Sequence, residues 1–583
     1  MAFLDKIAIP SDLKKLKIEE LDLLCEEIRA FFIESVLKNG GHFSANLGVV
    51  ELTVALHYVY DFLNDKIVWD VGHQAYIHKI LTGRKHNFNT IRKLNGLSGF
   101  PKIDESEFDH FGTGHSSTSI SAIMGMAEAD LLNDGNATHV AVIGDGSLTG
   151  GQAFEALNNL GVSKANVLVI VNDNQMGIDP NLGAISKHLS ELDGTHHNIF
   201  QNLNLPFQGS VDGHNVKGLI DLFQRQKDLK GPRVLHVKTL KGRGYPPAEQ
   251  AQTDWHSVSY VKIDPSNKET REVKPLKFQD VFGHTLVEIA EQDERVVGIT
   301  PAMPSGSSMK FLMEQMPERV FDVGIAEQHA VTFAAGLALN GKRPFCNIYS
   351  TFSQRGYDQI IHDVALQKIP VIFCLDRAGM VGEDGPTHHG TFDIAFLKPI
   401  PNLVILSPLN EHELRNMMYW ALDYDEGPVV IRYPRGRGSK RSYKNEPEAI
   451  KIGSARRLTN GSDIAILSVG EIGTEVERCI TDNNLENFVA HFDMRWIKPV
   501  SIELVKDIFN QFKTIVTVED GVQSGGFGQE IKNLGFDQKY VGELINLALP
   551  DSFIEHGEVS ELRMQNGLDA NSIYNIIRPF LKS

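Results

Sequence analysis

The sequence predicts an α/β protein of three domains, each built on a largely parallel sheet with flanking helices. Short β-branched runs alternate with helical stretches, as a parallel sheet requires. The 583 residues are enough for about three to five folded units, and two hydrophilic stretches divide them. We place the domains at 1–265, 275–435 and 448–583, with no short-period repeats.

The first domain is expected to open with an amphipathic helix around Glu19–Leu37. Its clearest βαβ unit begins with the strand Val140–Ile143 and the glycine-rich turn Gly144–Gly151. A helix at Gln152–Leu160 and a second strand at Val167–Val171 complete the unit. This order of strand, turn, helix and strand predicts two neighbouring parallel strands.

The second and third domains follow polar linkers. Val261–Lys274 is hydrophilic and precedes the second unit, and Arg435–Pro447 precedes the third. In the second unit the apolar run Val371–Leu375 leads into the long polar loop Asp376–His388, which we place at the carboxyl end of a strand. Two strands are expected in the third unit, at Ile464–Val469 and Thr514–Val518.

Charge and hydropathy limit the partners and the compartment. The chain has 57 Lys and Arg against 74 Asp and Glu, a net charge of −17, and no long basic block, so we expect no nucleic-acid partner. No signal peptide is visible, and no segment approaches the ~18 apolar residues of a membrane helix. The four cysteines are scattered, without a CxxC pair, which favours a reducing compartment. We therefore expect a cytoplasmic protein without membrane contact.

Two polar motifs lie at the ends of the predicted neighbouring strands. Gly144-Asp-Gly146 ends the first and Asn172-Asp-Asn174 ends the second. Parallel strands joined by a right-handed crossover end at the same edge of a sheet, so the motifs share a crevice. Carboxylate and amide oxygens suit Mg²⁺, which makes Asp145 and Asn174 candidate ligands, and the glycines allow a diphosphate to approach the backbone.

Each motif alone would more often be an ordinary turn or strand exit, and it is their combination that favours a metal site. A dinucleotide-binding G-x-G-x-x-G turn is weakened because Thr149 occupies the third glycine position. No Walker lysine follows the turn.

Three histidines lie in glycine-flanked polar loops, at His42, His73 and His115. A single histidine is usually structural, whereas three such loops favour a functional site. Zinc binding is disfavoured by their wide spacing and by the absence of a neighbouring cysteine or an H-E-x-x-H helix. Glu327 precedes an apolar helix. It could complement the helix N-terminus, or it could be buried and protonated and exchange a proton with a heterocycle; the residues alone leave both open.

These motifs resemble those of the thiamin-diphosphate enzymes, whose GDG…NDN signature holds Mg²⁺ and the cofactor diphosphate. Within this transketolase-like group, nearly the whole chain is similar to the 1-deoxy-D-xylulose-5-phosphate synthase family. The supporting segments begin at Trp69 (WDVGHQAY), Gly112 (GTGHSSTSIS), Asp322 (DVGIAEQHAVTFAAG), Tyr349 (YSTFSQRGYDQ), Asp376 (DRAG), Asp384 (DGPTH), Arg432 (RYPRG) and Phe553 (FIEHG).

The resemblance implies a transketolase-like fold in which the first domain binds the diphosphate of thiamin diphosphate and the second binds its aminopyrimidine. The third would mainly support assembly, as a homodimer. The implied metal ligands are Asp145, Asn174 and the Met176 carbonyl. The implied cofactor-binding residues are His73, Gly114, His115, Ser116, Gly146, Ser147, Asn174, Tyr245 and Glu327.

The implied reaction joins pyruvate to D-glyceraldehyde 3-phosphate with loss of CO₂, giving 1-deoxy-D-xylulose 5-phosphate for isoprenoid and thiamin biosynthesis. Glu327 would act on the aminopyrimidine, and His42 and His388 could hydrogen-bond or shuttle protons to substrate oxygens. An acceptor phosphate needs planar, permanently charged donors, and the loop residues Arg377 and Arg435 suit this task. Without the resemblance, these two arginines would be interpreted as members of surface ion pairs. The implied substrate-binding residues are Tyr349, Arg355, Arg377, Asp384 and Arg435.

The chain departs from the family pattern in three places. Met176-Gly-Ile-Asp179 stands where the family has Met-Ser-Ile-Ser, so the loop beside the metal site could differ. Trp255-His-Ser-Val258 replaces Tyr-His-Gly-Val, which keeps His256 but changes its neighbours. Roughly thirty or more residues are missing between Leu189 and Val211, which favours a tighter, better-ordered connection. We hypothesise that this shortening reduces lid mobility and changes solvent access to the site.

Two other functions remain open at this point. The first is a transketolase-like or other thiamin-diphosphate carboligase, which would be recognised by transfer of a two-carbon ketol unit without CO₂ release. The second is a catalytically silent cofactor-binding paralogue, which is disfavoured by the presence of Glu327, Asp145 and Asn174.

Overall fold

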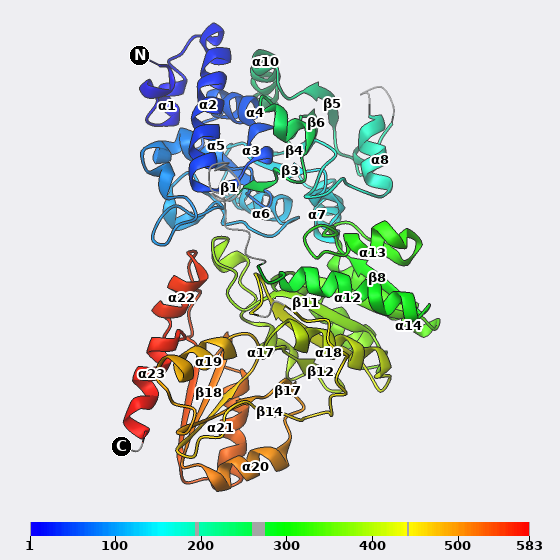
Figure 1. The fold of residues 1–583 in the computed structure, drawn as a ribbon. Helices are drawn as coiled ribbons and strands as arrows, with labels where there is room; N and C mark the ends of the chain where they lie inside the picture. Colours follow the sequence, from blue (N-terminus) through cyan, green and yellow to red (C-terminus); the bar gives the residue numbers. More distant parts are fainter. Residues whose placement is uncertain (1, 193–196, 259–273, 440–441, 582–583) are drawn as a thin grey trace. The chain divides into compact units, whose positions relative to one another are not determined.

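The computed structural model describes residues 2–192, 197–258, 274–439 and 442–581. The chain divides into two compact units, residues 1–269 with 324–326, and residues 270–323 with 327–583 (Figure 1). The first unit contains one five-stranded sheet and one short antiparallel pair, and the second contains a seven-stranded and a five-stranded sheet. The α/β class predicted from the sequence is confirmed.

The five-stranded sheet of the first unit is parallel throughout. The runs Val140–Ile143 and Val167–Val171 in its centre are continuous, apolar and buried, which is typical of a sheet covered on both faces. In spatial order the strands are β2 (Lys66–Trp69), β3 (His139–Gly144), β4 (Val167–Asp173), β6 (Arg233–Lys238) and β5 (Phe207–Asp212).

Alternate residues of the central strands enter different cores, because successive side chains point to opposite faces of a sheet. Val140 and Val142 of β3 pack with helices α2, α4 and α10. Ala141 and Ile143 pack with α6 and α7 on the other face. The helices of this unit are α1 (Pro10–Leu13), α2 (Leu21–Asn39), α3 (Ser44–Leu47), α4 (Val50–Val59), α5 (Tyr76–Lys79), α6 (Ser119–Leu132), α7 (Gly151–Leu160), α8 (Ala184–Glu191), α9 (Ile199–Asn202), α10 (Val216–Lys227) and α11 (Pro246–Gln250).

A short pair of antiparallel strands joins the last described residues of the first unit's main segment to residues near its beginning. β1 (Gly41–His42) pairs with β7 (Ser257–Val258). Beside this pair, the Phe43 N–H donates to the His256 carbonyl at 3.0 Å and the Ser44 N–H to the Trp255 carbonyl at 3.1 Å. The loop that carries His42 is therefore fixed by residues more than 200 positions later.

The seven-stranded sheet of the second unit is parallel except for its edge strand β17, which runs antiparallel to β12. One face is covered by α12 and α18. In spatial order its strands are β17 (Trp496–Lys498), β12 (Val404–Leu406), β13 (Val429–Pro434), β11 (Ile372–Ala378), β10 (Arg343–Tyr349), β8 (Val296–Thr300) and β9 (Val320–Asp322). The helices up to residue 423 are α12 (Phe278–Gln292), α13 (Lys310–Gln315), α14 (Glu327–Leu339), α15 (Ser350–Ser353), α16 (Tyr357–Gln359), α17 (Asp393–Leu397) and α18 (Glu411–Asp423).

The five-stranded sheet of the second unit is parallel except for β14, which is antiparallel to β16. In spatial order its strands are β14 (Arg456–Arg457), β16 (Val489–Asp493), β15 (Ile464–Ser468), β18 (Thr514–Val522) and β19 (Glu543–Leu549). Its helices are α19 (Gly473–Asp482), α20 (Ile502–Gln511), α21 (Phe527–Asp537), α22 (Val559–Gln565) and α23 (Ala570–Ile577).

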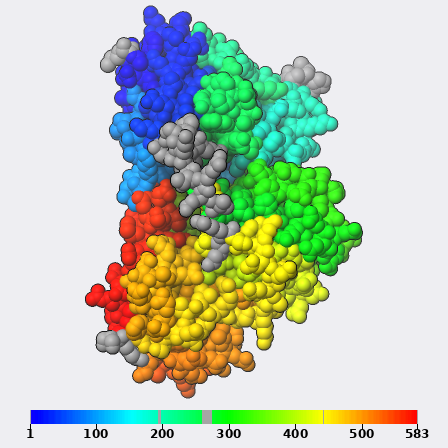
Figure 2. All heavy atoms as spheres, in the orientation of Figure 1, coloured from blue at the N-terminus to red at the C-terminus, as the bar shows by residue number. Residues whose placement is uncertain are grey.

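The two sheets of the second unit share structure. β17 comes from the third stretch of sequence but completes the sheet of the second stretch. Ile348 of β10 and Leu467 of β15 belong to one continuous buried core. The yellow and orange residues of the two stretches accordingly form a continuous surface (Figure 2).

A buried ion-pair cluster also joins these sheets. Arg432 of β13 donates through Nε to Asp393 Oδ2 and through Nη1 to Asp520 Oδ1 of β18, both at 2.8 Å. Although burial opposes the charge, the two carboxylates raise the pKa of Arg432 above its ordinary value. Arg432, part of one motif that carried the family resemblance, therefore has a structural task in this fold.

The predicted elements are found with small shifts of their ends. The strand predicted at Val371–Leu375 is β11, which continues to Ala378, so the first residues of the predicted polar loop belong to a strand with a register shift after Leu375. β18 extends past the predicted end at Val518 to Val522. The linker predicted at Val261–Lys274 lies, apart from Lys274, outside the described residues. The domain limits 1–265, 275–435 and 448–583 stay a prediction.

The helices of the described ranges include none that is long and apolar enough to cross a membrane. The four cysteines are buried and carry free thiols.

Replacing Arg432 with methionine is expected to destabilise the second unit by about 3–5 kcal/mol, because two buried carboxylates lose their cation. Chemical denaturation followed by near-UV circular dichroism measures the change. Arg295→Met is the matched control: Arg295 pairs with Asp293 at 2.6 Å, but its side chain is 60% exposed, and the expected loss is below about 1 kcal/mol. Equal losses in the two variants would contradict the structural role of Arg432.

Candidate active site

The ends of β3 and β4 bring the two predicted motifs together. Gly144 pairs with Asn172 across the two strands, and the Asp145 N–H donates to the Asn172 carbonyl at 3.2 Å. Asp145 and Asn174 therefore leave neighbouring strand ends at the same edge of the first unit's sheet, as the sequence predicts.

Asp145 is buried beside a second carboxylate. It is 3% exposed, and its Oδ2 accepts a hydrogen bond from Asn181 Nδ2 at 2.7 Å. Burial, together with the negative charge of Asp173, raises the pKa of Asp145 to about 7. A carboxylate in such a position is stabilised by any cation that binds to it.

The loop after β4 is folded by its own polar groups. Asn174 Oδ1 accepts from the Met176 N–H at 3.0 Å, and Lys241 Nζ donates to the Gly177 carbonyl at 2.5 Å. Lys241 is 1% exposed; its burial lowers its pKa to about 8, against the opposing effect of Asp179 and Asp145. A buried ammonium thus lies near Asp145, the carboxylate of the candidate metal site, and near Asp179.

Asp173, which precedes Asn174 in the chain, is held in place by His236 of β6. Its Oδ2 is 2.9 Å from His236 Nε2, and His236 Nδ1 is 2.6 Å from Ser210 Oγ. Ser210 Oγ in turn donates to the Leu192 carbonyl at 2.7 Å. The two ends of the shortened connection are therefore tied to the strand that carries the Asn172–Asn174 motif.

Asn46 holds two of the histidine loops in place. Its Nδ2 donates to the His42 carbonyl at 3.0 Å and to the His73 carbonyl at 2.8 Å. Its Oδ1 accepts from the Tyr76 N–H at 2.8 Å. One buried amide therefore fixes both backbones, although neither loop is near the other in sequence.

The histidines themselves form an aromatic group. The ring centroids of His42 and His73 are 5.7 Å apart, and His256 lies 5.8 Å from the first and 5.3 Å from the second. His42 Nδ1 lies 3.3 Å from Tyr76 Oη. His256 is a member of this group that the pattern of glycine-flanked histidines does not include, since it has no glycine neighbour.

The third histidine loop is positioned by Asp70. Its two carboxylate oxygens accept from the Ser117 N–H at 2.7 Å and the Ser119 N–H at 3.0 Å. Ser117 Oγ donates to the Ser147 carbonyl at 2.7 Å, close to Asp145 in the chain. The loop of Gly114, His115 and Ser116 therefore adjoins the loop of Gly146 and Ser147.

Tyr245 lies in the first unit beside Phe43, the residue that follows His42. Its ring packs against Phe43 at 5.3 Å and Trp255 at 5.1 Å between centroids. It therefore belongs to the edge of the apolar core near His42.

In the second unit, Glu327 begins helix α14 and is 4% exposed. Its Oε2 has no hydrogen-bond partner among the described residues, and the cation that compensates it is Arg355, whose Nη1 lies 3.5 Å away. Burial raises the pKa of Glu327 above its ordinary value, and Arg355 offsets part of this rise. Glu327 therefore lies in the first turn of its helix and is also a buried carboxyl group with a raised pKa, so both alternatives left open by the sequence agree with the structure.

A second polar group forms at the ends of β10 and β11. The Arg377 guanidinium lies 4.2 Å from the ring centroid of Tyr349, which ends β10. Arg377 also pairs with the neighbouring Asp376, and its φ of 61° is in the left-handed region. Burial raises the pKa of Asp376 to about 6, against the opposing effect of Arg377.

The remaining predicted residues are Asp384 and His388, in the loop after β11, and Arg435, directly after β13. Arg435 Nη1 is 3.6 Å from Asp384 Oδ2 and donates to the Val381 carbonyl at 2.8 Å. His388 Nδ1 is 2.9 Å from Thr387 Oγ1. The His388 ring lies 5.5 Å from that of Phe352, which stacks on Tyr349 at 5.4 Å. Tyr349, Arg377, Asp384, His388 and Arg435 thus lie in one neighbourhood of the second unit.

The C-terminal stretch supports this loop. His389 Nε2 is 3.2 Å from the Glu555 carbonyl. A Cβ at Gly385, whose φ is +70°, would lie 2.9 Å from the Cβ of His556, so a side chain at this position would be strained and crowded.

Several residues that hold these loops were not predicted from the sequence: Asn46, Asp70, Asn181, Lys241 and Asp376. Asp70 and Asp376 lie inside segments that carried the family resemblance, but the pattern gave no sign of their task. No group of three His, Cys, Asp or Glu able to hold a metal was found among the described residues. The predicted ligand set differs from such a group, since it combines one carboxylate with an amide and a carbonyl.

Three family models match successive parts of the chain. The model for 1-deoxy-D-xylulose-5-phosphate synthase matches residues 4–198 and 192–239. The transketolase pyrimidine-binding domain matches 274–440, and the transketolase C-terminal domain matches 453–573. The first model is matched in two pieces that meet at 192–198, within the connection that the sequence indicates to be shortened.

Curated relatives match over their full lengths. A 1-deoxy-D-xylulose-5-phosphate synthase of Cytophaga hutchinsonii is 48% identical, covering 98% of this chain and 97% of the relative. Those of Parabacteroides distasonis and Thermomicrobium roseum are 48% and 46% identical, covering 98% and 99% of this chain and 97% and 98% of their own lengths. With such identity over the whole length, the chain belongs to the 1-deoxy-D-xylulose-5-phosphate synthase family of transketolase-like enzymes.

Proposed function

We propose that the chain catalyses the decarboxylative condensation of pyruvate with D-glyceraldehyde 3-phosphate to 1-deoxy-D-xylulose 5-phosphate and CO₂. Thiamin diphosphate and Mg²⁺ would serve as cofactors, and the enzyme would act as a cytoplasmic homodimer. The observation that carries the proposal is Glu327, a buried carboxyl group with one oxygen lacking a hydrogen-bond partner among the described residues, in a chain of this family.

The Glu327 environment fits an aminopyrimidine. A buried polar atom without a partner costs free energy, and a bound ligand that supplies a donor or acceptor removes this cost. Burial raises the pKa of Glu327 above its ordinary value, which favours exchange of a proton between this carboxyl group and a ring nitrogen. Glu327 would therefore hold and move that proton.

The loops at β3 and β4 fit a diphosphate bound through Mg²⁺. The donor set of Asp145, Asn174 and the Met176 carbonyl consists of oxygen atoms, which Mg²⁺ prefers. A Cβ at Gly146 would lie 2.9 Å from Asn181 Oδ1, so a larger residue there would displace the side chain that hydrogen-bonds Asp145. We propose that Gly114, His115, Ser116, Ser147 and His73 line the same side, with Tyr245 at its edge.

When bound, thiamin diphosphate supplies the electron sink that loss of CO₂ requires. The other tasks fall to this chain's side chains. His42 and His388 are proposed to hydrogen-bond the substrate oxygens and move protons there. Tyr349 and Arg355 would lie at the edge of the substrate position. Arg355 would also compensate the charge of Glu327, which is 3.5 Å away.

The acceptor phosphate is proposed to bind Arg377 and Arg435. Both are permanently charged, and a guanidinium can hold two phosphate oxygens at once. Asp376 pairs with Arg377 and the ring of Tyr349 lies under it, so Arg377 is held in one orientation. Asp384 would play the same part for Arg435 at 3.6 Å.

The reaction is tested with the purified chain, thiamin diphosphate, Mg²⁺, carboxyl-labelled pyruvate and D-glyceraldehyde 3-phosphate. We expect one labelled CO₂ for each 1-deoxy-D-xylulose 5-phosphate formed, quantified by mass spectrometry. Ketol transfer without CO₂ would instead assign a transketolase-type reaction, and no turnover by a folded, cofactor-loaded protein would indicate a silent paralogue.

Glu327→Gln is expected to lower kcat by roughly 10²- to 10⁴-fold, the usual contribution of a positioned acid or base. The amide keeps the shape of the side chain but has no exchangeable carboxyl proton. Glu318→Gln, an exposed acid of the same unit, is the control and should keep normal turnover. Near-normal activity of a folded Glu327→Gln variant would remove Glu327 from its proposed task.

Arg435→Ala is expected to lower kcat/KM for D-glyceraldehyde 3-phosphate by about 10- to 150-fold, corresponding to about 1.5–3 kcal/mol for a charge-assisted hydrogen bond. The KM for pyruvate and the rate with unphosphorylated D-glyceraldehyde should change little. Arg437→Ala, two residues further and bonded to the Pro275 carbonyl at 2.9 Å, is the matched control. If both aldehydes are affected equally, the phosphate site lies elsewhere.

A further inference from the structure

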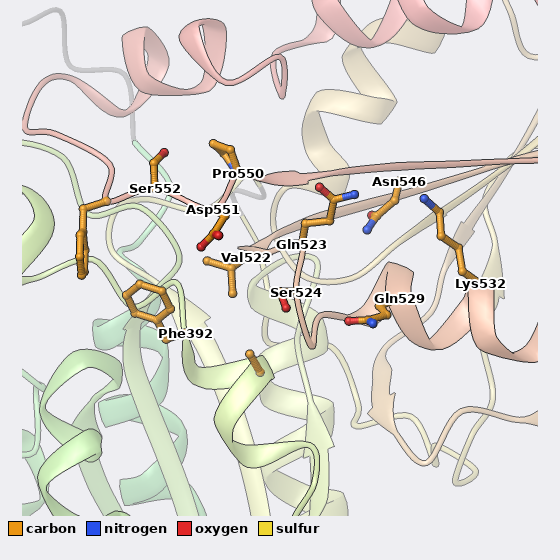
Figure 3. Close-up of a pocket in the computed structure, with 12 residues that line it drawn as sticks. Phe392, Val522, Gln523, Ser524, Gln529, Lys532, Asn546, Pro550, Asp551 and Ser552 are labelled. Carbon is orange, nitrogen blue, oxygen red and sulfur yellow. The ribbon is translucent and has the colours of Figure 1, made fainter.

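A cavity in the second unit lies outside the residues assigned to the reaction. Its volume is about 720 Å³, within the range of about 300–1,000 Å³ typical of small-molecule sites. It opens at the carboxyl ends of β18 and β19, the place at which open α/β sheets bind ligands. Figure 3 shows Phe392 at one end, Gln529 and Lys532 at the other, and Asp551 between them.

Three side chains at one end of the cavity offer hydrogen-bond donors, and Gln523 and Ser524 beside them can donate or accept. Asn546 Oδ1 accepts from Thr517 Oγ1 at 2.9 Å, so its Nδ2 is left to donate, and this buried atom has no partner in the described chain. Gln529 Oε1 accepts from the Gly525 N–H at 2.6 Å, which leaves its NH₂ group. The ammonium of Lys532 is the third donor. Three donors, one of them positively charged, are complementary to a phosphate group.

The middle and the far end have a different character. Asp551 contributes the carboxylate beside the cavity's centre and can accept hydrogen bonds from hydroxyl groups. Beyond it Phe392 meets Phe553 edge to face, with centroids 5.9 Å apart and planes at 76°. Phe553 remains 74% exposed, which leaves an aromatic surface on which a planar ring can pack.

We propose that this cavity binds a nucleoside monophosphate. The phosphate would accept from Lys532, Gln529 and Asn546, the ribose hydroxyls would donate to Asp551, and the base would pack on Phe392 and Phe553. The cavity shares no residue with the proposed active site, so the inference stands or falls independently of the proposed function.

Isothermal titration calorimetry tests the proposal on the full chain saturated with thiamin diphosphate and Mg²⁺, so that the cofactor site is filled. The probes are AMP, adenosine, which lacks the phosphate, and ribose 5-phosphate, which lacks the base. AMP is expected to bind with a Kd in the micromolar range, and each fragment at least roughly tenfold more weakly, because each loses one end of the cavity.

Two variants assign the binding to this cavity. Lys532→Ala should weaken AMP and ribose 5-phosphate by roughly tenfold or more and leave adenosine unchanged. Phe553→Ala should weaken AMP and adenosine but spare ribose 5-phosphate. Lys506→Ala, an exposed lysine of α20, is the control, and all three variants should keep the wild-type kcat. Absence of AMP binding up to ~1 mM, or AMP binding that both variants leave unchanged, would overturn the proposal.

Discussion

The candidate site depends on the burial of carboxylates. An ionised carboxylate is costly away from water unless nearby groups compensate its charge. Asp376 has such a group next to it in Arg377. Asp145 accepts a hydrogen bond from the Asn181 amide but lies beside Asp173, whose charge has the same sign. Glu327 has the Arg355 guanidinium 3.5 Å away. Where compensation by the protein is least complete, a bound cation or ring nitrogen has most to contribute, and those are the positions proposed for Mg²⁺ and the aminopyrimidine.

The part of the site that the sequence predicts is the part governed by a general rule of chain geometry. β3, α7 and β4 follow each other closely, and a right-handed crossover leaves no choice about which strand ends meet. The sequence alone therefore suffices to place Asp145 and Asn174 together. Family resemblance extended the site to Tyr349, Arg377, Asp384, His388 and Arg435, which the fold brings into one neighbourhood of the second unit.

The residues that escaped sequence reasoning act through contacts between distant parts of the chain. Asp70 holds Ser117, 47 residues later, and Lys241 holds Gly177, 64 residues earlier. Neither contact leaves a periodic pattern or a motif, because it requires only one polar atom at each end. β17 was not predicted from the sequence for the same reason. Its three residues belong to the third stretch but pair with β12 of the second, and a short edge strand has a weak sequence pattern.

The C-terminal stretch is consequently more than a separate supporting part. It supplies β17 to the seven-stranded sheet and Asp520 to the buried cluster around Arg432. In the loop that carries Asp384 and His388, its Glu555 carbonyl contacts the His389 ring and its His556 packs against Gly385. A loop bordered in this way loses little conformational entropy when substrate binds, since its conformation is already restricted. The position of the proposed acceptor site is therefore set by residues more than 150 positions away in the chain, which no local motif around Asp384 could specify.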